Sequence, residues 1–167
     1  MSNSFDLPQV ESFAVGTEGP AGQRVFFLQA VTSSQVVTLR LEKQQVALLA
    51  DYLSRVIASY ELEEAVATVM PPLYQPVISE WVVGSMMVAI DEAESKVIVI
   101  AEEMVPDESE DDPDSAPTGS QARFGLTRGQ VEAFVEGARE VVSSGRPTCP
   151  LCGRPIDADG HFCPRLN

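Results

Sequence analysis

The chain has 167 residues, of which 44% are hydrophobic and 22% charged, a composition typical of a folded protein and not of a collagen-like or disordered chain. This length is enough for one compact domain or two small ones. Lysine and arginine number 11 against 25 aspartate and glutamate, so the formal net charge is −14, which repels phosphate backbones and argues against nucleic acid as a partner.

The beginning of the chain contains no basic segment followed by an apolar stretch of signal-peptide length. The longest apolar stretch, residues 81–90, has about half the length that a membrane-spanning helix needs. The number of cysteines is odd, and thiols in a reducing compartment more often bind metals or lie buried than form disulfides. We therefore expect a cytoplasmic protein with no part embedded in a membrane.

A β-hairpin followed by an amphipathic helix is predicted in the first half of the chain. Residues 24–31 and 36–41 are two β-rich runs joined by a short polar turn. A segment that starts at Glu42 follows, and its apolar residues recur at intervals of three and four, which places them on one helical face. These residues are Val46, Leu49, Ala50, Leu53, Val56, Ile57 and Tyr60. Residues 61–70 could continue as a short helix, which Pro71 and Pro72 would end.

The same order of elements recurs in the second half. Residues 81–90, 96–102 and 122–126 are predicted strands, and a helix follows with Thr127 as its N-cap and Gln130 at the capping-box position. Its apolar face lies 85 positions after that of the first helix and consists of Val131, Phe134, Val135, Ala138, Val141 and Val142. Residues 9–15 would then correspond to residues 81–90, so each half has the order β-β-β-α. The alternative is that two amphipathic helices of similar length can be aligned by chance.

An acidic insertion interrupts the second set of elements between residues 106 and 120. Six of the eight residues from Asp107 to Asp114 are acidic, and such a block cannot bury apolar surface. It either serves only to keep the chain solvated or docks a basic partner or a divalent cation. The predicted domains are a first repeat at residues 1–70, a second repeat at residues 77–144 that includes the acidic loop 106–120, and a zinc-binding tail at residues 147–167.

Every cysteine and the only histidine of the chain lie within fifteen residues near its C-terminal end. Cys149 and Cys152 form a C-x2-C pair, and His161 and Cys163 form an H-x-C pair after eight intervening residues. Two such pairs joined by a turn can supply the four donors of a tetrahedral site. The pattern predicts one structural Zn²⁺, because four protein donors leave no position for a water nucleophile. The alternatives are free thiols beside an unrelated histidine, or a catalytic zinc with an open position.

The predicted fold class is α+β: two β-β-β-α repeats with antiparallel sheet and two covering helices, plus a C-terminal zinc-knuckle tail. The tail pattern C-P-L-C-G-x-P-x-D-x-x-G-H-x-C-P-R and the early segment R-V-F-F-L-Q-A are the most specific stretches. With them the chain resembles an actinobacterial family of uncharacterised conserved proteins, the domain of unknown function numbered 3090. The resemblance extends over nearly the whole chain and implies a bacterial, cytoplasmic setting, but it implies no activity.

The favoured function is that of a non-catalytic, zinc-containing protein-interaction or adaptor protein. The zinc knuckle would present Leu151, Ile156 and Phe162 to a protein partner, with Arg154 and Arg165 at the rim of the contact. One alternative is a single-stranded nucleic-acid binding protein of duplicated strand-helix architecture. The other is an uncharacterised zinc enzyme, which would need Glu80, Asp91 or an open metal position in a pocket.

Overall fold

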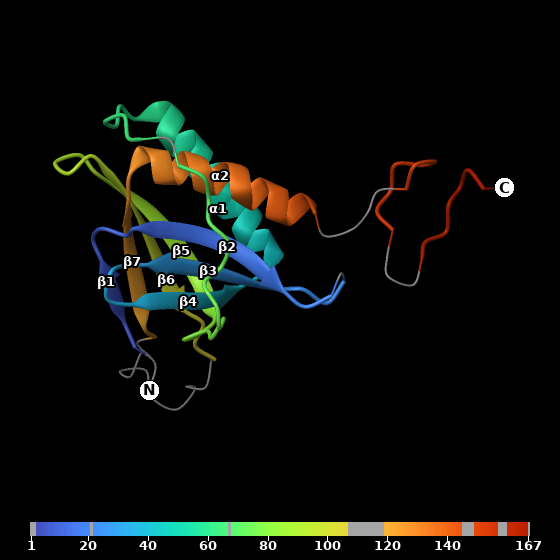
Figure 1. The fold of residues 1–167 in the computed structure, drawn as a ribbon, viewed down its shortest axis with the longest axis horizontal. Coiled ribbons are helices and arrows are strands. Elements are labelled where there is room, and N and C mark those ends of the chain that lie inside the picture. Colours follow the sequence, from blue (N-terminus) through green and yellow to red (C-terminus); the bar gives the residue numbers. More distant parts are fainter. Residues whose placement is uncertain are drawn as a thin grey trace.

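The structure, a computed structural model, describes residues 3–20, 22–66, 68–106, 119–144, 149–156 and 160–166. Within these residues the chain forms seven strands and two helices (Figure 1). Their bounds are β1 Phe5–Leu7, β2 Ser12–Glu18, β3 Val25–Val31, β4 Val36–Leu41, α1 Lys43–Ser59, β5 Val83–Asp91, β6 Lys96–Glu103, β7 Gln121–Leu126 and α2 Arg128–Ser143. None of the helices among the described residues is long and apolar enough to cross a bilayer.

The strands form two sheets that meet along one side. The first sheet has the order β2-β3-β4 and the second the order β1-β7-β6-β5, and all neighbours are antiparallel except β1 and β7. The sheets are joined where Arg40 of β4 pairs in parallel with Val82, just before β5. Here the Arg40 N–H donates to the Trp81 carbonyl at 3.0 Å, and the Glu80 N–H donates to the Thr38 carbonyl at 2.8 Å.

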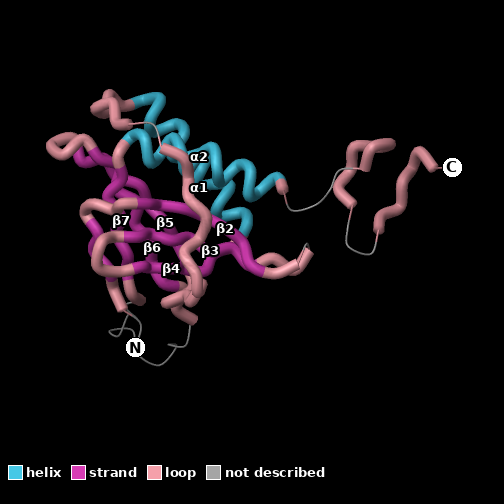
Figure 2. Tube along the Cα trace, viewed as in Figure 1, coloured by secondary structure: helices cyan, strands magenta, loops and turns pink. Residues whose placement is uncertain are grey.

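The two helices lie side by side over the same face of the strands, as Figure 2 shows. One continuous core connects both sheets with both helices. At its centre the ring of Phe13 in β2 lies 4.8 Å from that of Phe134 in α2 and 5.5 Å from that of Phe124 in β7, measured between ring centres. Aromatic pairs at these separations stabilise a core beyond the area they bury.

The predicted elements are largely those observed, with shifted ends at the first strand of each half. The hairpin of β3 and β4 and the capping box of α2 are confirmed. The strand expected at residues 9–15 lies at Ser12–Glu18, and the one expected at residues 81–90 lies at Val83–Asp91. The short strand β1 was not predicted, and it pairs with β7 of the second half of the chain. The predicted acidic loop lies mostly outside the described residues.

The short helix suggested for residues 61–70 is absent from the described part of that segment, residues 61–66 and 68–70. The chain there packs instead against the outer side of α2, where glycine permits close approach. A Cβ added at Gly129 would lie 2.5 Å from the carbonyl oxygen of Val66, and one at Gly137 would lie 2.5 Å from the end of the Met70 side chain. These contacts with α2 outweigh the weak helical preference of so short a segment.

Beyond its contacts with α2, the chain continues through residues 71–76 across the outer face of the β2-β3-β4 sheet. The Tyr74 N–H donates to the Gln29 side-chain oxygen at 2.6 Å, and the Gln29 amide nitrogen donates back to the Tyr74 carbonyl at 3.2 Å. Gln29 also donates to the Thr38 hydroxyl at 3.0 Å. The buried Gln29 side chain thereby forms hydrogen bonds to the backbone of a segment 45 residues away and holds that segment in place across the sheet.

Candidate metal centre

The C-terminal segment, residues 149–156 and 160–166, follows α2 and lies apart from the two sheets in Figure 1. Its first turn carries Cys149 and Cys152. The Gly153 N–H donates to the Cys149 carbonyl at 2.9 Å, and the Cys149 N–H donates to the Arg154 carbonyl at 2.8 Å. Gly153 has φ 73° and Gly160 has φ 91°, a left-handed conformation that glycine adopts without strain.

The structure brings together all four residues that the sequence singled out. The donor atoms of Cys149, Cys152, His161 and Cys163 all lie within 4.8 Å of one another. The Cys149 and Cys163 sulfurs are 3.9 Å apart, and the Cys152 sulfur is 3.3 Å from Nε2 of His161. A tetrahedral zinc with ordinary bond lengths places two sulfurs about 3.8 Å apart and a sulfur and a nitrogen about 3.6 Å apart. The four residues could therefore hold a metal ion.

The backbone around the thiols favours their charged form at one end of the cluster. The N–H groups of Cys152 and Leu151 point at the Cys149 sulfur and hold the pKa of that thiol below its usual value. At Cys163 the Arg165 N–H acts in the same direction, but burial and the neighbouring sulfurs of Cys152 and Cys149 prevail, and the pKa is raised. A cation bound among the sulfurs would remove this mutual repulsion.

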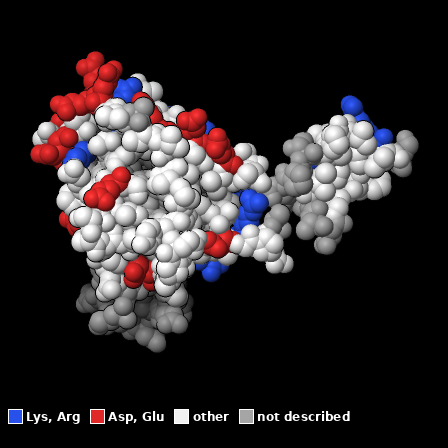
Figure 3. All heavy atoms as spheres, in the orientation of Figure 1, with Lys and Arg blue, Asp and Glu red and all other residues white. Residues whose placement is uncertain are grey.

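The donor set suits a soft divalent ion. Three sulfurs and one imidazole are typical zinc ligands, whereas calcium and magnesium prefer oxygen. Cys149 and Cys163 are buried, while Cys152 and His161 are half-buried. Three thiolates and a neutral imidazole around a divalent ion leave a formal charge of −1. The described part of this segment contains the arginines Arg154 and Arg165, and Figure 3 shows blue atoms, but no red ones, on its visible described surface.

Two acidic residues considered for an enzyme site have different surroundings. Asp91 lines a cavity of about 630 Å³ together with Glu92 and Arg123. Its carboxylate accepts the Glu94 N–H at 3.1 Å, a bond that shapes the turn between β5 and β6. Glu80 is not among the residues that line this cavity.

Sequence reasoning did not single out the hollow between α1 and β5, which Tyr52, Tyr60 and Val88 line. The sequence spacing predicts Tyr60 on the apolar face of the helix, yet it is 47% exposed. In the sequence, this surface is indicated only by Tyr52 and Tyr60, which lie two helical turns apart. The other wall of the hollow comes from β5, a strand distant in the sequence.

Comparison with known proteins places the chain in a family. No curated protein and no solved structure matches the chain significantly. A family model described as "Protein of unknown function (DUF3090)" matches residues 5–163, which include both sheets, both helices and all four residues of the cluster. The chain therefore belongs to the DUF3090 family.

Proposed function

We propose that Cys149, Cys152, His161 and Cys163 bind one structural Zn²⁺, and that the protein acts as a non-catalytic protein-interaction or adaptor protein. The observation that supports this proposal is the convergence of four donor atoms within 4.8 Å, two pairs of which, at 3.9 Å and 3.3 Å, lie close to the spacing of donors around a tetrahedral zinc. Four protein donors close the coordination shell, so the ion would supply shape and stability and no nucleophile.

The need for a metal follows from the small size of the segment. Its apolar side chains are mostly exposed: Phe162 by 80%, Leu166 by 73% and Leu151 by 47%. A segment that buries so little apolar surface has no core of its own, and small domains of this kind depend on metals or disulfides. Metal binding contributes on the order of 10 kcal/mol to the folding of zinc-finger peptides, which is enough to order such a segment.

The same exposure supports a role in recognition. Leu151 and Phe162 form apolar surface on a segment whose described charged residues are Arg154 and Arg165. Apolar anchors with arginine at the rim are typical of protein interfaces. The proposed partner is a protein, whereas the net charge of −14 disfavours nucleic acid. A cytoplasmic location belongs to this proposal, because a reducing compartment keeps the thiols available to the metal.

Metal analysis of the purified protein tests the ligand set. We expect about one zinc per chain by elemental mass spectrometry, and loss of the metal in Cys152→Ser and His161→Ala. Cobalt substitution should give the thiolate charge-transfer absorption of a tetrahedral site. Phe162→Ala should keep the zinc but weaken capture of the partner, which separates recognition from folding. A wild-type protein that neither contains zinc nor takes it up would refute the metal site.

We also infer that the body, residues 3–144, consists of two β-β-β-α repeats, with residues 1–70 and 77–144 as the units and residues 147–167 as the metal-binding tail. The bounds of β4 and β7 differ by 85 positions at both ends, and α1 and α2 begin 85 positions apart. The strand register agrees with this spacing. Across the first sheet Ser12 is aligned, through Val31, with Val36, and across the second sheet Ser85 is aligned, through Glu102, with Gln121, which lies 85 positions after Val36. The agreement of strand register with helix spacing supports duplication over chance alignment.

A further inference from the structure

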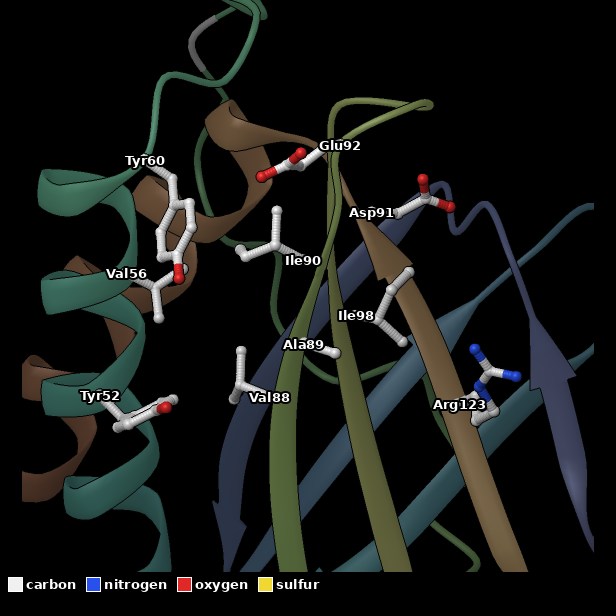
Figure 4. A pocket seen from close by; sticks show the side chains of 10 residues that line it. All are labelled: Tyr52, Val56, Tyr60, Val88, Ala89, Ile90, Asp91, Glu92, Ile98 and Arg123. Carbon is white, nitrogen blue, oxygen red and sulfur yellow. The ribbon is translucent and has the colours of Figure 1, made fainter.

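A groove runs between helix α1 and strand β5. We call it the α1/β5 groove; its larger cavity, of about 660 Å³, is lined by Gln45, Leu48, Leu49, Tyr52, Arg55 and residues 84–88. The cavity of about 630 Å³ shown in Figure 4 adjoins it, since both include Tyr52 and Val88. In Figure 4, Val88 and Ile90 point from β5 toward the helix, whereas Ala89 lies on the other side of the strand.

The walls of the α1/β5 groove are apolar and accessible. Leu48 is 61% exposed, and Tyr52 and Met87 are each 50% exposed. Among the described residues that line the larger cavity, Arg55 is the one that carries a charge. Strand β5 is the last strand of its sheet, and beyond the start of the strand its outer edge faces the groove. A sheet edge of this kind offers backbone groups to an added extended segment.

The other half of the protein contains an equivalent groove between α2 and β2. Gln130 and Ala133 of α2 lie 85 positions after Gln45 and Leu48, and residues 11–13 correspond in register to residues 84–86. The α2/β2 groove is occupied by the chain itself. Thr68, Val69, Met70 and Pro71 line the small remaining space of about 40 Å³ together with these residues.

The contacts in the α2/β2 groove show what kind of segment such a groove accepts. Residues 68–71 are neither helix nor strand, and the Thr68 hydroxyl donates to the Gly129 carbonyl at 3.3 Å. Beyond Pro71 and Pro72 the chain continues onto the outer face of the sheet, where the Leu73 side chain lies against Gly16. The occupant is thus an uncharged stretch that is neither helix nor strand, in which Met70 and Pro71 are half-buried and Val69 is 90% exposed.

The helix walls of the two grooves differ in a way that explains why only one is filled internally. At the positions where α2 has Gly129, Ala133 and Gly137, helix α1 has Gln44, Leu48 and Tyr52. The small residues of α2 let the segment that contains Val66 and Met70 approach the helix backbone. The larger residues of α1 would hold a bound peptide farther from the helix and nearer the β5 edge. Exposed leucine and tyrosine in a groove lined by the terminal strand of a sheet are features of a binding surface.

We propose that the α1/β5 groove binds an extended, apolar, proline-containing peptide segment of a partner protein. The segment would lie along the β5 edge between Leu48 and Met87, in the place that residues 68–71 take in the α2/β2 groove. This inference deepens the proposed interaction role and rests on it, but the surface is on the body and needs no metal.

The test uses the zinc-loaded full chain and a fluorescein-labelled peptide with the sequence of residues 66–76, Val-Ala-Thr-Val-Met-Pro-Pro-Leu-Tyr-Gln-Pro. We expect saturable binding by fluorescence anisotropy with a Kd below about 1 mM. Leu48→Glu and Met87→Glu, at exposed positions that tolerate charge, should each weaken binding about tenfold or more. Ile78→Glu, at an apolar position that is 70% exposed and outside the groove, is the matched control and should leave binding unchanged.

Hydrogen exchange locates the bound peptide. The expected result is slower exchange of the β5 amides between residues 84 and 90, with no change at Ser12 or Gly129. The proposal is overturned if the peptide fails to saturate, if Ile78→Glu weakens binding as much as Leu48→Glu, or if protection falls on the α2/β2 groove. Concentration-dependent dimerisation that Leu48→Glu abolishes would assign the groove to a second copy and also overturn it. Peptide binding that survives removal of zinc by a chelator separates this result from a failure of the metal site.

Discussion

Gln45 and Gln130, which lie 85 positions apart, perform the same two tasks at the starts of the two helices. Gln45 accepts the Glu42 N–H at 2.8 Å, and its amide nitrogen donates to the Val83 carbonyl at 3.2 Å. Gln130 accepts the Thr127 N–H at 2.9 Å and donates to the Val10 carbonyl at 2.8 Å. Each glutamine therefore caps its own helix and ties it to the other half of the chain, Gln45 to the start of β5 and Gln130 to the residues just before β2.

The first prediction concerns these two glutamines. Gln45→Ala and Gln130→Ala should each lower the free energy of unfolding by about 1–2 kcal/mol, because each removes a capping bond and a bond between the two halves. Urea denaturation followed by circular dichroism measures the change. Gln44→Ala, one position away on the exposed side of α1, should have almost no effect. Equal losses at Gln44 and Gln45 would contradict the proposed role.

The second prediction concerns Gly125 of β7. A Cβ at this position would lie 2.0 Å from the carbonyl oxygen of Pro8, so the backbone between β1 and β2 must move to accept a side chain. Gly125→Ala should destabilise the protein by about 3 kcal/mol or more, as overpacking of a rigid contact does. Gly137→Ala faces the flexible end of Met70 and should cost clearly less. Thermal unfolding measures the loss of stability in the two variants. A larger loss in Gly137→Ala than in Gly125→Ala would contradict the prediction.

The third prediction concerns the buried Gln29. Gln29→Leu keeps the volume of the side chain but removes its bonds to the Tyr74 backbone and the Thr38 hydroxyl. The substitution leaves the buried Thr38 hydroxyl and the partly buried Tyr74 N–H without these partners, so the free energy of unfolding should fall by about 1–3 kcal/mol. Gln35→Leu in the exposed turn between β3 and β4 is the control. Amide exchange at Tyr74 should accelerate in Gln29→Leu alone, and unchanged exchange there would count against the bond.

The fourth prediction concerns removal of the metal. Chelation should disorder the C-terminal segment and leave the body folded, because the core of both sheets and both helices contains no residue of that segment. Nuclear magnetic resonance spectra should lose the dispersed signals of residues 149–166 while those of β6 and α2 persist. Restoring zinc should restore the lost signals. Collapse of the whole spectrum on chelation would show that the metal supports the body as well.

Local patterns were enough to predict most of the helices and strands and the metal cluster. The β-rich run at Val36–Leu41, the three-and-four spacing from Val46 to Val56 and the capping pair Thr127 and Gln130 are features of neighbouring residues. The close spacing within C-x2-C and H-x-C likewise forces Cys149 and Cys152, or His161 and Cys163, to lie near each other. Such short-range features depend on backbone geometry more than on distant contacts.

Tertiary structure decided the pairing of β1 with β7, the non-helical path of residues 61–66 and 68–70 and the open α1/β5 groove. Each of these depends on surfaces that meet only after the chain has folded: Gly129 and Gly137 let a segment of the chain approach the α2 backbone, whereas the larger Leu48 and Tyr52 line a groove that stays open. The sequence of a segment sets its own preference, but the shape of the surface it meets determines which conformation buries more area. For that reason the amino-acid sequence alone established the elements and the cluster, and the packing of distant elements established which grooves are filled.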